Sequence, residues 1–382
     1  MRNSYRSTDE VVAQCSSNNK NVHLNFSQMK LFASGAFSNV YSGMAKTDSS
    51  HEMPVVVKKT WPRNKDSLLE VEILKRLGKL KHKNVVQLLY SYTKKHEALV
   101  CLSLIFEYVP LNLHQFLKEN NRRLDILEVK MITWQLFRGQ SHLQKSKICH
   151  RDIKPQNLLF NADTGLLKIS DFGSSLILSA STPQASYHVT RYYRPPELLL
   201  GSKFYSCEVD VWSCGCVFGE LLKGGIFLAG KSATNQAEIV FDALGCPTKD
   251  DLTAMQASNK KYQEIKMGYE ADPARRTLNF SFMYDQTINT QRDRRTIVYN
   301  NKINQREMRE SVDLVRQILV YNPERRLSGI DLLTNGYFNE LFSANSLRSN
   351  GKRIQCLSPA DLHAVRSGDG TVSLDTTDGE GL

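Results

Sequence analysis

Apolar residues in the first part of the chain come in short runs that alternate with small and turn-forming residues. This pattern is typical of β-strands, and we expect strands within residues 26–57, 85–89 and 99–106. One segment differs: Leu69, Ile73 and Leu77 repeat at every fourth position, which predicts a helix from Asp66, a suitable N-cap, to a stop at Gly78. The first part should therefore be rich in strands and contain one helix.

The second part of the chain, after residue 110, has a helical period instead. Apolar residues between Val129 and Leu143 recur at helical spacing and mark a long amphipathic helix that should end before Cys149. Further helical patterns occupy residues 210–222, 235–245 and 307–321. The first of these is apolar on nearly all sides, so it should be a buried helix. A strand-rich part followed by a helical part predicts an α+β fold.

The two ends of the chain show no such period. Residues 1–25 are polar and rich in Ser and Asn, and we expect them to be a disordered extension. The pattern also fades after about residue 343, and the final stretch is acidic, with Asp369, Asp375, Asp378 and Glu380. We therefore expect residues 343–382 to form a flexible acidic tail.

Composition narrows the class of protein further. The formal net charge is +11, but the basic residues are dispersed, so a nucleic-acid-binding protein is an alternative with no motif behind it, and we expect no nucleic acid partner. The cysteines do not form paired CxxC motifs, which is typical of reduced thiols in an intracellular protein. No apolar stretch approaches the length of a membrane span. We expect an intracellular, cytoplasmic protein that can also enter the nucleus. We expect no membrane association.

The segment from His150 to Asn157, followed by Asp171-Phe172-Gly173, carries the most specific chemistry. In-line transfer of the γ-phosphoryl group of ATP needs a carboxylate to orient the acceptor hydroxyl, oxygen ligands for Mg²⁺ and cations against the spreading charge. Asp152 fits the first role, and Asn157 with Asp171 fits the second. Lys154 stands two residues after Asp152, where it can reach the transferring group of a Ser or Thr acceptor. Two such elements in this order are a strong signal.

A second group of residues fits a site for the phosphates of ATP. Lys58 ends the apolar run at 55–57 and can pair with the α- and β-phosphates, while Glu70 on the predicted helix is its counter-charge. Glu72 is a poorer candidate because it faces another side of that helix. The loop around Gly35 keeps the central glycine and Val40 of a glycine-rich phosphate loop, with Ala33 and Ser38 in place of the outer glycines.

Weaker signals concern the adenine ring. Glu107 and Val109 follow an apolar strand, and their backbone groups could read the adenine edge. Leu159 would lie beneath the ring. Phe106 would be a bulky residue at the back of the pocket, and Val56 stands where a smaller alanine is usual, which should narrow the pocket.

Together with Pro195-Pro196-Glu197, these motifs resemble the eukaryotic protein kinase superfamily over about residues 26–342. The resemblance implies a two-lobed fold with a small β-rich N-lobe (26–109) and a larger helical C-lobe (110–342), ATP and Mg²⁺ as cofactors, and transfer to Ser or Thr of protein substrates. The run 186–197 and the later segment 243–248 look most like the glycogen synthase kinase 3 family.

That resemblance implies further roles. Tyr187 would be the activation-loop tyrosine, whose phosphate could pair with Arg191 or Arg194. Thr190 would hydrogen-bond Asp152 and Lys154. The remaining implied residues are structural: a buried pair of Glu197 with Arg326, and Asp210 with Trp212 beneath the catalytic loop.

The chain also departs from the family. The family reads a phosphate already present on the substrate through three basic residues, of which only Arg151 remains, because Leu69 and Leu176 occupy the other positions. We expect little dependence on such a primed substrate. A scaffold protein could bind at about residues 243–305, or 268–305 could be a disordered insertion. An inactive kinase that acts as a scaffold is the alternative to the enzyme.

Overall fold

The computed structural model describes residues 9–34, 38–48, 51–61, 66–96, 99–178, 190–272, 277–283 and 300–368. The chain divides into two compact units. The first consists of Met1–Pro110 with Ser170–Leu176 and Ser373–Leu382, and the second of Leu111–Ile169 with Ile177–Val372.

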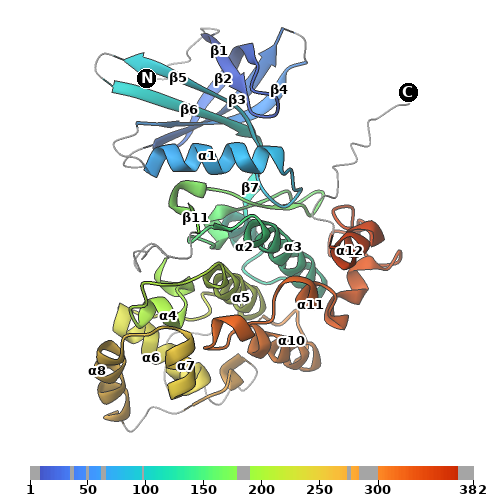
Figure 1. Cartoon of the computed structure of the whole chain (residues 1–382). Helices are drawn as coiled ribbons and strands as arrows, with labels where there is room; N and C mark the ends of the chain where they lie inside the picture. Colours follow the sequence, from blue (N-terminus) through green and yellow to red (C-terminus); the bar gives the residue numbers. More distant parts are fainter. Residues whose placement is uncertain are drawn as a thin grey trace. The chain divides into compact units, whose positions relative to one another are not determined.

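A closed antiparallel barrel forms most of the first unit (Figure 1). Its strands, in spatial order, are β1 (Asp9–Cys15), β2 (Asn21–Ser34), β3 (Ser38–Thr47), β4 (Met53–Thr60), β6 (Leu99–Glu107) and β5 (Leu88–His96). Alternate residues point inward, as the period of two requires. The inward set includes Leu24, Ala45, Val55, Val57 and Ile105, which are fully or almost fully buried.

The helix of the first unit is α1 (Asp66–Lys79). The sequence correctly predicts its position, but the expected stop at Gly78 is wrong, because the helix continues to Lys79. Ile73, Leu74 and Leu77 are buried apolar side chains of this helix. The strand expected at 85–89 is also misplaced: β5 begins at Leu88 and extends through a polar stretch to His96.

The expected disorder of residues 1–25 is wrong for the part that the structure describes. Strand β1 pairs with β2 from Asp9↔Phe26 to Gln14↔Asn21, and it meets β5 at Gln14↔Ser91 and Cys15↔Tyr90. Ala13 of this strand is buried in the barrel core. The segment is polar because only alternate residues of this strand face the core, and the residues that face outward can be polar. Its composition therefore gives no indication of a strand.

The second unit is largely helical (Figure 1). Its α-helices are α2 (Leu113–Glu119), α3 (Ile126–Lys145), α4 (Pro196–Leu199), α5 (Glu208–Lys223), α6 (Ala233–Leu244), α7 (Lys249–Ala254), α8 (Asn259–Glu270), α10 (Gln305–Ile318), α11 (Gly329–Leu333) and α12 (Pro359–Arg366). The short strands are β7 (Leu111–Asn112), β8 (Ile148–Cys149), β9 (Leu158–Phe160), β10 (Leu167–Ile169) and, where the two units meet in the sequence, β11 (Leu176–Ile177). The 3₁₀ turns are η1 (Pro155–Asn157), η3 (Arg191–Tyr193), η4 (Ser281–Met283), η5 (Pro323–Arg325) and η6 (Gly336–Phe342), with η2 (Phe172–Ser174) in the first unit.

Helices α3 and α5 form the centre of this unit and pack against each other. Trp134 and Phe137 of α3 and Trp212 and Phe218 of α5 are almost completely buried. Both helices are placed as the sequence predicts, and the fold class is α+β as expected. The polar segment 268–305 lies mostly outside the described residues.

The expectation of a flexible tail from residue 343 is wrong as far as residue 368. This segment contains α12, and Arg348 forms a buried ion pair with Glu128 of α3, with an Nε–Oε1 distance of 2.8 Å. Lys352 pairs with Asp163 at 3.3 Å. These contacts fasten residues 343–368 to the rest of the second unit. The acidic residues from Asp369 onward lie outside the described part of the chain.

None of the described helices is long and apolar enough to cross a lipid bilayer.

Candidate active site

Lys58 lies at the centre of the first group of candidate residues. Its Nζ is 2.7 Å from Oε1 of Glu70 on α1 and 3.1 Å from Oδ1 of Asp171. Burial alone would lower the pKa of Lys58, but the two carboxylates outweigh that effect and raise it above its ordinary value. Lys58 is therefore a permanent cation at neutral pH. Glu72 is exposed, and the lysine pairs with Glu70 instead.

The strand register explains why Lys58 does not join the barrel core. Val55 and Val57 point into the core, so Val56 and Lys58 point to the opposite face of β4. On that face Val40 of β3 lies opposite Lys58. Ala33 of β2 lies opposite Val40 in turn. Three of the residues predicted to contact ATP thus form one row across three strands.

The bulky pair predicted at the back of the adenine pocket is also on this face. Val56 lies directly opposite Phe106 of β6 in the antiparallel register, and both side chains are half-buried. Directly opposite side chains in a sheet are only about 4.5–5.5 Å apart at Cβ. The two side chains are therefore close neighbours on this face of the barrel.

The other residues predicted to contact the nucleotide are Glu107, Val109, Leu159 and Gly35. Glu107 ends β6, and its Oε1 accepts a hydrogen bond from the backbone N–H of Gln87 at 3.1 Å. Val109, just beyond it, is half-buried. Leu159 belongs to β9 of the second unit and is also half-buried. Gly35 lies outside the described residues.

The second group of candidate residues surrounds Asp152 in the second unit. Lys154 Nζ is 2.7 Å from Asp152 Oδ2, and Thr190 donates its hydroxyl to Asp152 Oδ1 at 2.6 Å. Lys154 also donates to Thr190 Oγ1 at 3.2 Å. Asn157 Nδ2 donates to Oδ2 and to the carbonyl of Asp152, at 2.8 and 2.9 Å. Both carboxylate oxygens of Asp152 are thus held by neighbouring donors.

A buried carboxylate supports the loop that carries Asp152. Asp210 of α5 accepts the backbone N–H groups of His150 and Arg151 at 2.6 and 2.8 Å. Arg151 has a φ of 64°, in the left-handed region. The two hydrogen bonds hold the backbone in this unfavourable conformation. Burial raises the pKa of Asp210, and His150 and the two backbone donors oppose that shift.

Asn157 in the second unit and Asp171 in the first each carry a side-chain oxygen. Mg²⁺ prefers carboxylate and amide oxygens. Asn157 directs its Nδ2 toward Asp152, and its other side-chain polar atom, Oδ1, is a carbonyl oxygen of the kind that Mg²⁺ prefers. Asp171 is held in the left-handed region, with φ 63° and ψ 80°, and its side chain is half-exposed. Strained backbone of this kind is common at functional sites.

The arginine expected to bind a substrate phosphate already has a partner. Arg151 is buried, and its Nη1 donates to the hydroxyl of Tyr205 at 3.2 Å. Leu176 is buried in the first unit, and Leu69 is half-buried there. Neither leucine can supply a charge to a phosphate.

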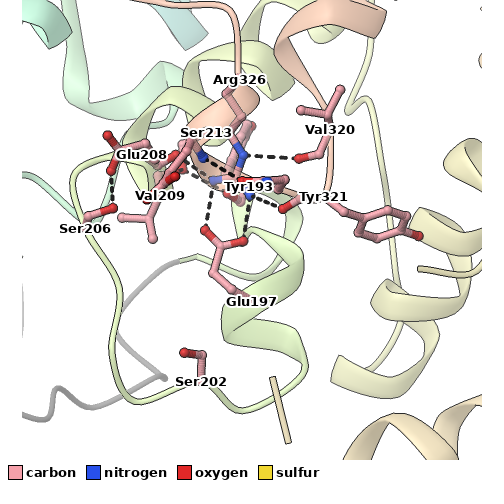
Figure 2. Close-up of polar contacts among 12 residues, drawn as sticks. Tyr193, Glu197, Ser202, Ser206, Glu208, Val209, Ser213, Val320, Tyr321 and Arg326 are labelled. Carbon is pink, nitrogen blue, oxygen red and sulfur yellow. Dashed lines mark hydrogen bonds and ion pairs between the residues drawn. The ribbon is translucent and has the colours of Figure 1, made fainter. Parts of the chain in front are cut away.

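Glu197 and Arg326 form a fork of two hydrogen bonds, at 2.8 and 2.6 Å, within the second unit (Figure 2). Figure 2 also shows Arg326 donating to the carbonyl groups of Val320 and Tyr321. The guanidinium lies over the Trp212 ring, 5.3 Å from its centroid. This pair fastens α4, which follows the predicted activation segment, to the helical core.

The activation segment itself is only partly described. Tyr187 lies outside the described residues. Arg191, a predicted partner for its phosphate, donates Nη1 to the carbonyl of Lys231 at 2.6 Å.

Sequence reasoning missed one buried polar cluster next to this segment. Tyr193 donates its hydroxyl to Glu220 of α5 at 2.6 Å, and Arg122 lies 3.5 Å from the same carboxylate. Burial raises the pKa of Glu220 above its ordinary value. The hydrogen bond from Tyr193 and the charge of Arg122 oppose this shift but do not cancel it. Glu220 gave no signal because it stands within an apolar helical run.

Comparison with known proteins shows the family. The model of the protein kinase domain matches residues 26–338, so the chain belongs to the protein kinase family. Among its relatives is glycogen synthase kinase 3 of Trypanosoma brucei brucei, 33% identical over 338 residues that make up 86% of each chain. Another is glycogen synthase kinase 1 of Pyricularia oryzae, 32% identical over 323 residues, or 83% of this chain and 73% of the relative.

Proposed function

We propose that this protein is a protein Ser/Thr kinase that transfers the γ-phosphoryl group of ATP to protein substrates. The observation that carries the proposal is the cluster of Asp152, Lys154 and Thr190, joined by hydrogen bonds of 2.6–3.2 Å. A carboxylate fixed beside a lysine can orient a substrate hydroxyl and accept its proton while the lysine neutralises the transferring group. The family match supports a kinase, and Lys154 favours Ser and Thr acceptors.

The residues of the first unit would bind the nucleotide. Lys58 would contact the α- and β-phosphates, and Glu70 would hold the lysine in position. Ala33, Gly35 and Val40 would lie along the phosphates and the ring, while Glu107 and Val109 would read the adenine edge. By the same resemblance, Leu159, a residue of the second unit, would lie beneath the ring. Val56 and Phe106 would exclude nucleotides with large groups at the back of the pocket.

Asn157 and Asp171 would hold Mg²⁺, which would screen the negative charge of the phosphates. The residues present fit this ion, because both offer oxygen donors. The chain's own contribution is to hold the two side chains in place: Asn157 through Asp152, and Asp171 through Lys58.

We further propose that the kinase does not require a primed substrate. Only Arg151 remains of the three cations that the related family uses, and Tyr205 accepts a hydrogen bond from it. Each missing charge-assisted contact with a phosphate is worth roughly 1.5–3 kcal/mol. A primed substrate would therefore gain little over an unprimed one.

Labelled-ATP transfer to an array of Ser/Thr peptides tests the activity. Asp171→Asn and Asp152→Asn are the matched controls, since each changes one oxygen to an amide nitrogen and leaves the size unchanged. Transfer by the wild type that disappears in both variants is the expected result. If Mg²⁺–ATP and a phosphorylated Tyr187 still give no transfer above the controls, the protein is a binding scaffold and not an enzyme.

The same array in primed and unprimed forms tests substrate choice. We expect a primed-to-unprimed rate ratio near one. Leu69→Arg restores one cation at a half-buried position and should raise the ratio by about tenfold, the equivalent of 1.4 kcal/mol. A large preference of the wild type for primed peptides would contradict the proposal without affecting the assignment as a kinase.

A further inference from the structure

Strand β1 contacts both the barrel and the helix that carries Glu70. On the barrel side, the backbone N–H of Ser16, just after β1, donates to the carbonyl of Leu89 at 2.9 Å. On the helix side, Lys75 Nζ of α1 donates to Gln14 Oε1 at 2.7 Å. Ser16 also lies against α1, since a Cβ placed on Gly78 would be 3.7 Å from Ser16 Cβ.

The pleat of β1 explains how one strand makes both contacts. Ala13 points into the barrel core and is almost completely buried. Its neighbour Gln14 therefore points to the opposite face, where α1 lies. Lys75 is half-buried, so its hydrogen bond to Gln14 is partly shielded from water. A charged donor and a shielded position favour a strong, directional contact.

The β1 contact lies at a different place on α1 from the contact with Lys58. At 1.5 Å per residue, Lys75 is about 7.5 Å farther along the helix than Glu70, and about 140° around its axis. Glu70 holds the first half of α1 to Lys58, whereas Lys75 holds the second half to β1 through Gln14, and Gly78 lies beside Ser16. Two separated attachments resist both rotation and sliding of the helix, whereas one attachment leaves a pivot.

We propose that β1 positions α1 for the Lys58–Glu70 pair, with Gln14 and Lys75 as positioning residues. The inference rests on the proposed function, because a kinase is active only when this ion pair is formed and the position of the helix decides whether it is. The chain thus supplies the contact that holds its own α1 in the active position.

Four variants and one control test the proposal. Gln14→Leu removes the acceptor of the hydrogen bond, and Lys75→Met removes its donor. The double variant completes a double-mutant cycle. Its effect should be no larger than that of either single variant, because both remove the same contact. Gln14→Glu keeps an acceptor and should preserve the contact. Arg76→Met is the matched control, because Arg76 is the next residue of α1 and is exposed. The measurements are the KM for ATP, kcat, the melting temperature and hydrogen exchange of the α1 amides.

We expect Gln14→Leu and Lys75→Met each to raise the KM for ATP by ~5-fold and to speed exchange of the α1 amides by a similar factor. Gln14→Glu and Arg76→Met should behave like the wild type. Equal exchange and KM in all variants would overturn the proposal, as would a Gln14→Glu variant as impaired as Gln14→Leu. If the wild type transfers no phosphate, the proposed function fails, and the exchange measurement still decides whether β1 holds α1.

Discussion

Two buried arginine–glutamate pairs fasten distant segments of the second unit, and they differ in how completely each arginine is satisfied. Arg326 donates five hydrogen bonds, two to Glu197 and three to backbone carbonyl groups, and it also stacks on Trp212. Arg348 donates two to Glu128, at 2.8 and 3.3 Å, and one to the carbonyl of Asp163. The guanidinium of Arg326 therefore has more hydrogen-bond partners than that of Arg348.

The difference shows what a buried ion pair contributes. Removing two charges from water costs several kcal/mol per ion, and mutual attraction repays this cost only when further hydrogen bonds complete the geometry. Arg326 meets that condition better than Arg348. Burial raises the pKa of Glu128 even though Arg348 opposes the shift, so the ionised pair at Glu128 does not fully offset its own burial. We expect the first pair to be the stronger stabiliser.

Replacing Arg326 with Met should give the largest effect. The change leaves Glu197 buried without its partner, and such a loss costs roughly 3–5 kcal/mol. Denaturant unfolding of the wild type and the variant would measure it. Arg326→Lys is the matched control: it keeps the charge but cannot form the planar fork, so it should recover only part of the stability. A variant as stable as the wild type would contradict the ranking of the two pairs.

Arg348→Met should cost less, about 3 kcal/mol, because fewer contacts are lost. The loss should also release residues 343–368 from α3, which limited proteolysis with mass spectrometry can detect as new cleavage in that segment. Lys352→Met, in the same segment, removes only an exposed pair and should cost under about 1 kcal/mol. An equal cost at Arg326 and Arg348 would show that the additional hydrogen bonds do not matter.

Replacing both members of the weaker pair should reverse most of the damage. In Arg348→Met/Glu128→Leu no buried charge remains, and apolar side chains of similar volume should return stability to within about 1 kcal/mol of the wild type. The corresponding double change at Arg326 and Glu197 should recover less, since carbonyl partners of Arg326 would remain unsatisfied. Unfolding curves of both double variants provide the comparison. A double variant no more stable than Arg348→Met would refute this account.

The smallest effect concerns pH. Between pH 4.5 and the raised pKa, Glu128 is still protonated in the folded protein. In the unfolded protein, the same carboxyl group is already ionised at these pH values. Stability should therefore fall as pH rises from 4.5 through the raised pKa of Glu128, and should be unaffected by this group at lower pH. The stability of the wild type minus that of Glu128→Gln should decrease across this window. A difference that stays constant with pH would argue against the raised pKa.

The two pairs also differ in how far the sequence predicts them. Glu197 and Arg326 stand in recognisable motifs, so a resemblance to a family pairs them although they are far apart in the chain. Arg348 follows the point where the apolar pattern fades, and nothing local marks its partner. Burial of an isolated charge depends on tertiary contacts, which periodicity does not report.

The candidate site shows the same division. Lys58, Glu70, Asp152, Asn157 and Asp171 could be named from the sequence because phosphoryl transfer restricts both residue type and spacing. The role of β1 could not be predicted, because its pairing with β5 is non-local and its polar outward face resembles a loop. Glu220 was missed for a related reason: its partner Tyr193 comes close only through the packing of α5.

Closure of the barrel by β1 has a consequence for the protein's association with other copies of itself. Without β1, the outer side of β5 would expose unpaired N–H and C=O groups, and such an edge is a template for adding a strand from another molecule. The cover is short, because β1 meets β5 only at Gln14↔Ser91 and Cys15↔Tyr90. A chain cleaved after residue 16 would expose this short edge of β5 and also the longer edge of β2 that β1 pairs with, so we expect it to aggregate as well as lose activity.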